Sequence, residues 1–485
     1  MFPSFTEASL RRLVSAATLL AGLYSLGCGG GGNSGPAAPV PTQAVAVTWL
    51  KQTATPFTSV EPSSSETDLA FVDGLVGNAT IIGLGEATHG SSEFQKMKHR
   101  LFEYLVEHKG VTAFGLEAQM GRCLAIDQFV QTGQGDATQI LENQGFWVWS
   151  TQEMLDLVNW MRAYNSDPSH TQKLHFFGFD MQDGGTEMDQ VISYLQPIDA
   201  QAATNLTALY APFRPYTWAG GMADYQAASR TLRSQCHANI QQAYQWMVTN
   251  QAAYSAATGA ESYALALQMA KVVVQNEAMQ SDDPSGLGRS NVRDQSMAGN
   301  VDWYLEEMGP GAKVVLSAHN GHVNKKGPTS QWTAMGDWLS QNHGAAYFSL
   351  GFAFDSGSFN AVWENADGTY GQLQSNTATP AGSGSYEDTI AQTGLNLAVL
   401  DLRHLDLTQL GPAWFNQPHD LREIGAVWNA TPGYCVNNSS LPSRFDALVF
   451  LNKVTATTFL PGYLNPTAQN PTPYLQSRIK TRGMP

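Results

Sequence analysis

IIGLGEATHG, residues 81–90, joins a short apolar run to a glycine turn that presents Glu86 and His89 three positions apart. A strand that delivers a carboxylate and an imidazole to its carboxyl end is a common way for α/β proteins to build a site. Imidazole titrates near neutral pH, and a neighbouring carboxylate fixes its tautomer, so the pair suits proton transfer. For this peptide taken alone, a satisfied turn histidine is the better explanation, because short polar turns follow many strands.

Strand and helix patterns alternate beyond this turn, which is typical of an α/β sheet. Apolar runs predict strands at 80–85, 112–116, 173–179, 313–318, 346–354, 395–400 and 447–451. Apolar residues at helical spacing predict helices at 93–109 and 151–165. We therefore expect a central, mostly parallel sheet flanked by helices.

The alternation stops between residues 186 and 308. This segment has little strand signal but much Ala, Gln, Met and Leu at helical spacing. We expect a helical insertion that covers one edge of the sheet as a lid or wall. With no internal repeat in view, residues 46–485 are expected to form one α/β domain that includes the insertion.

The composition is that of a globular protein, with 43% hydrophobic residues among 485 and only 14% charged residues. A surface so poor in charge suits an exported protein. The net charge of −15 argues against nucleic acid or an anionic membrane surface as a partner. It also disfavours a strongly anionic substrate.

The N-terminus has the features of a targeting segment. Arg11 and Arg12 precede an apolar run, residues 13–27, that is too short to span a membrane. The run ends at Cys28, followed by glycines and a flexible tether, which resembles a bacterial lipoprotein signal. Ser25 stands where such signals usually carry Leu, so an ordinary cleaved signal peptide remains an alternative.

We therefore expect a signal peptide over 1–28, a flexible linker over 29–45 and export to the bacterial cell envelope. Membrane association is expected only through lipid on Cys28; otherwise the protein would be periplasmic or secreted. The remaining cysteines are Cys123, Cys236 and Cys435. Without a CxxC pair they suggest neither zinc nor redox chemistry, and one disulfide plus one free thiol is allowed.

Three predicted strands end in residues of catalytic type. The first is followed by Glu86 and His89, the second ends at Glu117, and a later one leads to His319 and His322. The carboxyl ends of parallel strands share one edge of a sheet, so these side chains should converge. Each motif alone is explained by packing, but three of matching chemistry predict a catalytic cluster.

The same histidines and glutamates would also suit zinc, so a metal-dependent hydrolase remains an alternative. A non-catalytic ligand-binding protein of the envelope is a second one. No GxSxG elbow, GxGxxG turn after a strand or P-loop occurs in the sequence. We therefore expect neither a serine hydrolase of the usual α/β kind nor a nucleotide cofactor.

Further candidates for substrate binding are Lys98, Arg100, Trp147 and Arg293. The two cations on the helix after the turn could reach an anionic intermediate, although salt bridging explains Lys98 better. Trp147 could line an apolar pocket, and core packing explains it about as well. Arg293 and Asp294 open a helix and are expected to orient loops of the site, although capping would account for Asp294 without a function.

Six segments together resemble the erythromycin esterase family. They are GEATHG (85–90), FGLEAQ (114–119), FWVWSTQEMLDLVNWMRAYN (146–165), FFGFD (176–180), VRDQSMAGN (292–300) and VVLSAHNGHV (314–323). They occur in the family's order, and FDALVFLN (445–452) adds a weaker match. The resemblance implies an α/β core with a helical insertion, and ester hydrolysis without a metal, another cofactor or a nucleophilic side chain.

In family members that open macrolide lactones, a histidine activates water directly, and the resemblance gives that role to His89. Glu86 and Glu117 match the family's carboxylates, and His319 and His322 match its second histidine pair. The expected substrate is a small-molecule ester or lactone, with macrolides as one candidate.

One departure from the family is Lys98, where the best-known macrolide esterases carry arginine nine residues after the catalytic histidine. The single ammonium of lysine replaces a guanidinium that can donate two parallel hydrogen bonds. Arg100 is the neighbouring residue that could supply the missing donors. Export is a second departure, because resistance esterases are typically cytoplasmic.

Overall fold

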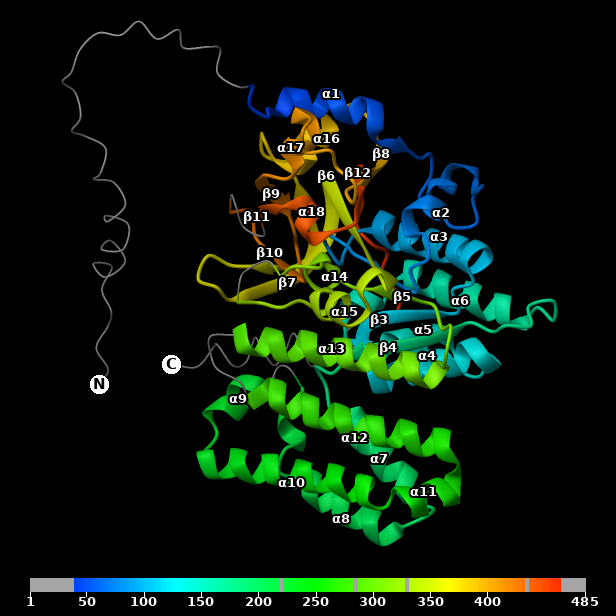
Figure 1. Ribbon diagram of the computed structural model, residues 1–485. Helices are drawn as coiled ribbons and strands as arrows, with labels where there is room; N and C mark the ends of the chain where they lie inside the picture. Colours follow the sequence, from blue (N-terminus) through cyan, green and yellow to red (C-terminus); the bar gives the residue numbers. More distant parts are fainter. Residues whose placement is uncertain (1–38, 219–220, 282–286, 328–330, 432–435, 464–485) are drawn as a thin grey trace, which may run out of the picture. The chain divides into compact units, whose positions relative to one another are not determined.

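The computed structural model describes residues 39–218, 221–281, 287–327, 331–431 and 436–463 (Figure 1). The expected signal peptide, its lipid site Cys28 and Cys435 lie outside the described residues. The first helix, α1 (Gln43–Thr53), begins inside the segment expected to be linker, and the side chain of Thr42 caps it. No helix in these ranges is long and apolar enough to cross a membrane.

A mixed sheet organises the fold. Within the described ranges it has 10 strands, in the order β1-β8-β12-β6-β2-β5-β3-β4, with β7 and β10 also paired to β6. Its strands are β1 (Thr55–Pro56), β2 (Ile81–Leu84), β3 (Ala113–Gln119), β4 (His175–Asp180), β5 (Val314–Ser317), β6 (Tyr347–Glu364), β7 (Tyr370–Ala378), β8 (Leu397–Asp401), β10 (Val427–Trp428) and β12 (Ala447–Val454). β9 (Pro418–Arg422) and β11 (Val436–Ser440) form a separate antiparallel pair.

The six strands from β12 to β4 are mutually parallel. Strand β8 is antiparallel to β12, and β1 is antiparallel to β8. The expectation of a mostly parallel sheet is therefore confirmed. All seven predicted strands are present, although β6 is much longer than predicted because it continues into a hairpin with β7.

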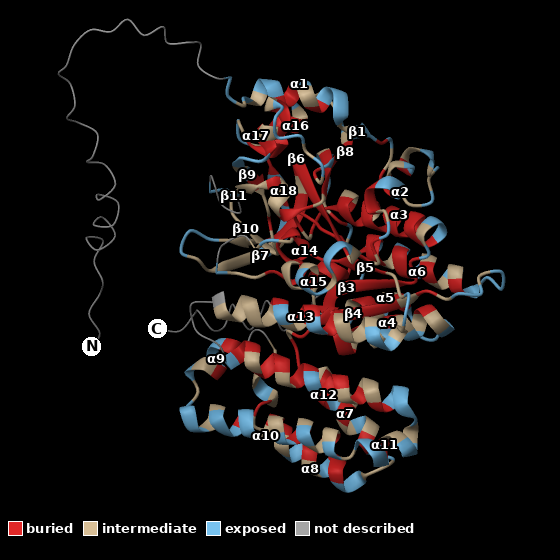
Figure 2. Cartoon of the chain, in the orientation of Figure 1, coloured by how far each residue is buried: buried red, intermediate tan, exposed pale blue. Residues whose placement is uncertain are grey.

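Helices cover both faces of the sheet because the central strands are apolar on both sides. In β2, Ile82 and Leu84 enter one core cluster while Ile81 enters the other. The first face carries α2 (Phe71–Val76), α3 (Ser92–Lys109), α4 (Met120–Thr132), α5 (Ala137–Glu142) and α6 (Gln152–Ser166). The second carries α1, α13 (Leu287–Met308), α14 (Asn320–Val323), α15 (Met335–His343), α16 (Tyr386–Ala391), α17 (Leu410–Phe415) and α18 (Leu441–Arg444). Figure 2 shows the buried strands between these layers.

The predicted helical insertion is present. It consists of α7 (Gly185–Leu195), α8 (Ala200–Tyr210), α9 (Met222–Ala227), α10 (Arg230–Thr249), α11 (Gln251–Thr258), α12 (Ala260–Ser281) and α13. The insertion has an apolar core of its own, which includes Met188, Leu206, Ile240 and Met269. Its last helix, α13, returns to the sheet and packs Met297 against it.

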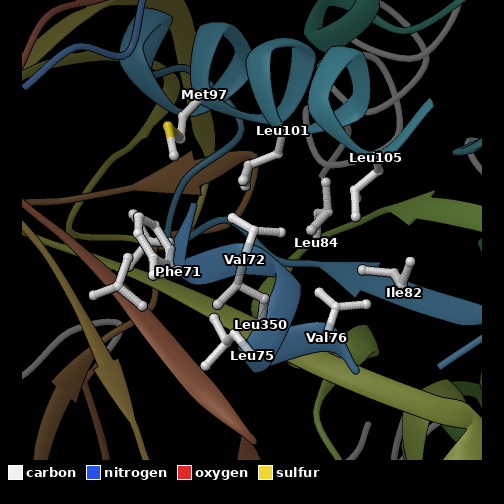
Figure 3. A pocket seen from close by; sticks show the side chains of 12 residues that line it. Phe71, Val72, Leu75, Val76, Ile82, Leu84, Met97, Leu101, Leu105 and Leu350 are labelled. Carbon is white, nitrogen blue, oxygen red and sulfur yellow. The ribbon is translucent and has the colours of Figure 1, made fainter. Parts of the chain in front are cut away.

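Two hollows lie away from the polar strand ends. A cavity of about 10 Å³ between α2, β2 and α3 is lined wholly by apolar side chains, among them Val72, Leu84 and Leu101 (Figure 3). At about the volume of one water and without polar partners, it stays dry and belongs to core packing. A hollow of about 300 Å³ beside Leu402 and Phe445 lies where β12 begins, at the opposite edge of the sheet from the carboxyl ends.

A buried carboxyl group at the base of the insertion gives a test of the fold. Glu187 on α7 is fully buried, and its Oε1 accepts a hydrogen bond from the Gly121 amide of α4 at 2.8 Å. Burial and the nearby charge of Asp183 raise its pKa from 4.5 to about 8. The folded protein therefore holds a proton that the unfolded chain releases, so this contribution to stability is lost as pH rises from 4.5 through 8.

Glu187→Gln should remove this loss. Between pH 4.5 and pH 7 the variant should gain about 3 kcal/mol of unfolding free energy relative to wild type. Urea unfolding of both proteins at the two pH values measures the difference. Any effect of the substitution on packing is common to both pH values, and a gap that does not change with pH would contradict the expectation.

Candidate active site

The carboxyl ends of β2, β5 and β3 meet as predicted. Ser317, the last residue of β5, is in register with Leu84 of β2 on one side and Leu116 of β3 on the other. The turns that follow these strands therefore start side by side, and they bring Glu86 and Glu117 together with His319, which caps α14, and His322 within it. The prediction that these residues converge is confirmed.

Glu86 and His89 form a close pair. Nδ1 of His89 lies 2.5 Å from Oε1 of Glu86, whose side chain is fully buried, while His89 keeps 12% of its side chain exposed. An ionised carboxylate can only accept, so Nδ1 carries the proton and Nε2 of the neutral ring holds the free electron pair. The pair thus presents a basic nitrogen whose tautomer is fixed.

Two further donors hold the other oxygen of Glu86. Lys98 Nζ donates to Oε2 at 2.6 Å, Gln95 Nε2 donates to it at 2.7 Å, and Lys98 also donates to Ser317 Oγ at 3.0 Å. Burial alone would raise the pKa of Glu86, but Lys98 and His89 lower it to about 2. Lys98 is only 1% exposed, so pairing with Glu86 is the role that the structure shows, and it does not present its charge to a ligand.

His319 is hydrogen-bonded at both ring nitrogens. Nδ1 accepts from the Gly321 amide at 3.0 Å, and Nε2–H donates to the Ile424 carbonyl at 3.1 Å. Burial and the neighbouring His89, whose ring centroid is 5.2 Å away, lower the pKa of His319 to about 4. Its backbone amide donates to Glu117 at 2.8 Å. His319 is therefore a neutral residue that ties its turn to β3 and to the 424 segment.

Arg293 of α13 joins the insertion to the cluster. It donates from Nη2 to Glu117 at 2.6 Å and from Nη2 and Nε to Asp180 at 2.7 and 3.1 Å. Its Nη1 lies 3.0 Å from Nε2 of His322. Burial raises the pKa of Glu117, but His322 and Arg293 more than offset this and hold it well below its usual range. The guanidinium is thus engaged by protein groups, as expected for a residue that orients the site.

His322 is held by Asp294. Its Nδ1 lies 2.8 Å from Oδ1 of Asp294, and its Nε2 lies 3.3 Å from Oε1 of Glu117. Asp294 is itself fixed by the Met335 amide at 2.7 Å and by Nε1 of Trp332 at 3.0 Å. Asp294 lies inside α13 and holds His322, so it orients the site, which was one of the two explanations expected for it, and it is not a helix cap.

Arg100 does not reach the cluster. Its guanidinium is buried against Asp68 and the backbone carbonyls of Ser59 and Ser65, where it fixes the segment before α2 to α3. The expectation that Arg100 binds substrate or compensates for Lys98 is therefore wrong.

Trp149, rather than the predicted Trp147, borders the site. The Trp149 ring lies edge-on to His89 at 6.1 Å between centroids, and its Nε1 donates to the Glu117 carbonyl at 3.1 Å. Trp147 is 2% exposed and packs against Phe459 in the core, as the packing explanation for it requires.

Sequence reasoning missed three residues of the cluster: Asp180, Gln95 and Ser317. Asp180 is the last residue of β4, and Glu117 lies near the end of the neighbouring strand β3. The argument that strand ends converge would therefore have found Asp180 as well. Gln95 is one turn from Lys98 on α3, and its role depends on the buried position of Glu86. Ser317 reads only as a strand residue in the sequence.

The two glutamates that could hold a metal, Glu86 and Glu117, are engaged by protein cations. Across the described ranges, no group of three or more His, Cys, Asp or Glu side chains is arranged to hold a metal ion. Cys123 and Cys236 are buried free thiols, and burial raises the pKa of both, so neither is an activated nucleophile.

The strand ends of this α/β sheet gather the glutamates and histidines, and the helical insertion adds Arg293 and Asp294. This arrangement defines a class already suggested by the sequence motifs. The family model for erythromycin esterase matches residues 106–454, and the chain belongs to this family. The match includes Glu117, Arg293, His319 and His322; the 85–90 turn precedes it.

Individual relatives are distant but cover most of the chain. The Escherichia coli protein named erythromycin esterase type II is 24% identical, over 84% of this chain and 97% of its own. A Bacillus cereus protein of solved structure has a TM-score of 0.76 at 27% identity, covering 86% of this chain and 99% of its own. An erythromycin esterase mutant in an open conformation has a TM-score of 0.65 at 18% identity, covering 82% and 97%.

The Glu86–Lys98 pair can be tested through stability. Lys98→Met leaves a buried carboxylate without its cation, which should cost about 3 kcal/mol of unfolding free energy. Glu86→Gln in the same chain removes the charge that needs the cation, so the double variant should lose less than the two single losses added together. Urea unfolding of the four proteins at pH 7.5 measures the coupling. Additive losses would show that the two charges do not depend on each other.

Proposed function

We propose that the protein hydrolyses an ester or lactone, with His89 as the general base that activates water. The observation that carries the proposal is the pairing of a fully buried, ionised Glu86 with the partly exposed His89. This arrangement fixes the proton on Nδ1 and leaves Nε2 as the acceptor for a proton of water. Membership of the erythromycin esterase family supports the same reaction class.

In the proposed reaction, Nε2 of His89 takes a proton from water while the oxygen attacks the substrate carbonyl carbon. The carbonyl electrons move onto oxygen, and the resulting imidazolium is stabilised by Glu86. The side chains that hold Glu86, Lys98 and Gln95, would keep it ionised during this step. A general base of this kind contributes roughly 10²–10⁴-fold in rate.

The proposed substrate is an uncharged or cationic small molecule, and macrolide lactones are one candidate. The name of the Escherichia coli relative supports a macrolide, and the net charge of −15 disfavours strongly anionic esters. No resident cofactor is assigned. A metal-dependent hydrolase using the same side chains is the rival that the experiment separates.

His89→Ala should lower ester hydrolysis by at least about 10²-fold, because it removes the proposed general base. Purified protein would be incubated with a macrolide and a panel of simple esters, with and without chelator. Mass spectrometry would follow the gain of one water. His108→Ala, which removes a surface histidine from the same chain, is the matched control and should keep full activity.

Equal activity of the His89 and His108 variants would contradict the assignment of the base. Activity lost to chelator and restored by zinc would make the histidines metal ligands. If the wild type opened none of these esters, ester hydrolysis itself would be wrong.

We also propose that the protein is exported and held in the cell envelope by lipid on Cys28. Expressed at full length in a bacterial host, the wild type should fractionate with membranes, and its mass should show loss of residues 1–27 and gain of lipid. Cys28→Ser should release the protein from the membrane fraction, because two or three acyl chains are what anchors such a protein firmly. A variant that stays with membranes unchanged would exclude the lipid anchor.

A further inference from the structure

His322 lies where a proton could be given up and taken back. Its Nε2 is 3.3 Å from Oε1 of Glu117 and 3.0 Å from Nη1 of Arg293. Glu117 is the ion-pair partner of a protonated ring, and Arg293 can donate to an unprotonated Nε2. Each protonation state of His322 therefore has a partner that stabilises it, which lowers the free-energy cost of moving between the two states.

Asp294 sets which nitrogen of His322 exchanges its proton. Its carboxylate is fully buried, and its oxygens are already held by the Met335 amide and by Nε1 of Trp332. Nδ1–H of His322 donates to Oδ1 of this fixed carboxylate at 2.8 Å. Nδ1 is thereby kept protonated, and Nε2 is left as the exchanging atom.

His319 differs from His322 in this respect. Its two ring nitrogens bond the Gly321 amide and the Ile424 carbonyl, so the ring is locked in one neutral tautomer. Giving a proton to a substrate would break its bond to Ile424 and leave an anionic ring. Of the two histidines in the 319–322 turn, His322 is the one whose contacts suit an acid.

We propose that His322 is the general acid that protonates the leaving alkoxide, and that Asp294 is its positioning residue. This inference rests on the proposed function and deepens it. When the tetrahedral intermediate collapses, the bond from carbon to the leaving oxygen breaks and its electron pair stays on that oxygen. The oxygen takes the proton from Nε2 of His322, and the N–H electron pair stays on nitrogen.

The remaining protons balance. The imidazole left on His322 is neutral and accepts a hydrogen bond from Arg293. His89 then releases to solvent the proton that it took from water, and His322 takes one proton from solvent. The net reaction adds one water to the ester and gives one acid and one alcohol.

The charges around His322 are consistent with an acid at neutral pH. Asp294 and Arg293 face it from α13, Glu117 faces it from β3, and His319 lies in its own turn. Burial lowers the pKa of His322, but the two carboxylates more than offset this, so the pKa is raised above 6.5.

Leaving-group dependence tests the proposal in the full-length chain. The substrates are a simple alkyl ester and the p-nitrophenyl ester of the same acid, because nitrophenolate leaves without a proton and an alkoxide does not. His322→Gln should lower kcat/KM on the alkyl ester by about 10²-fold or more and on the nitrophenyl ester by only a few-fold. His89→Ala should lower both, because both need activated water.

Asp294→Asn should show the same selectivity as His322→Gln with a smaller loss, which a merely structural role would not produce. His319→Gln is the comparison within the same turn, and it should affect the two esters alike. Equal losses on both esters for His322→Gln would overturn the assignment.

A second measurement does not depend on turnover. Nitrogen-15 NMR of histidine-labelled protein reports whether each ring nitrogen carries a proton. Both nitrogens of His322 should be protonated at pH 7 in the wild type, and Asp294→Asn should lower the pH at which Nε2 loses its proton. A neutral His322 at pH 7 would overturn the proposal even if esters are cleaved. A wild type that cleaves neither ester would instead show that the proposed function has failed, and the acid role would fall with it.

Discussion

The buried ion pair between Glu86 and Lys98 is the contact on which the rest of the site depends. Two opposite charges with almost no solvent exposure are costly apart and tolerable only together. Through Ser317, the pair also joins the turn after β2 to α3 and β5. The orientation of His89 follows from it, because the same carboxylate that Lys98 holds fixes the imidazole.

A second set of charges completes the site from the other side. Arg293 and Asp294 are consecutive on α13, yet they serve different partners: one neutralises Glu117 and Asp180, and the other holds His322. Because α13 belongs to the helical insertion, the insertion is a structural part of the site. This explains why segments so far apart in the chain carry the family's motifs.

The sequence was sufficient for the fold around the site and for its main residues. Continuous apolar runs identified the buried parallel strands, and parallel strands place their carboxyl ends at one edge, so the convergence of Glu86, Glu117 and His319 followed. Strand β7 and the pair β9–β11 were not predicted. Strand β7 is mostly polar and only two of its positions are buried, so it lacks the continuous apolar run by which the other strands were recognised.

Partners were harder to predict than positions. Lys98 and Arg100 are two residues apart on one helix, which separates them by about 200° around its axis. They therefore point to different surroundings, and only Lys98 meets Glu86, while Arg100 meets Asp68. Trp147 and Trp149 are separated in a similar way by a single 3₁₀ turn, and only Trp149 lies beside His89. The sequence does not state which of two such neighbours faces the site.

The spread of the cluster along the chain has a consequence for how the protein folds. Its members run from Glu86 to Trp332, with the whole insertion between β4 and β5. Parallel strands that are far apart in the sequence pair slowly, because the chain loses the entropy of loop closure before the strand contacts stabilise it. β5 lies between β2 and β3, so these two strands cannot be joined until the chain beyond the insertion has arrived. A chain that stops short of residue 332 therefore lacks a complete cluster, and one that stops short of residue 424 lacks the carbonyl that holds His319.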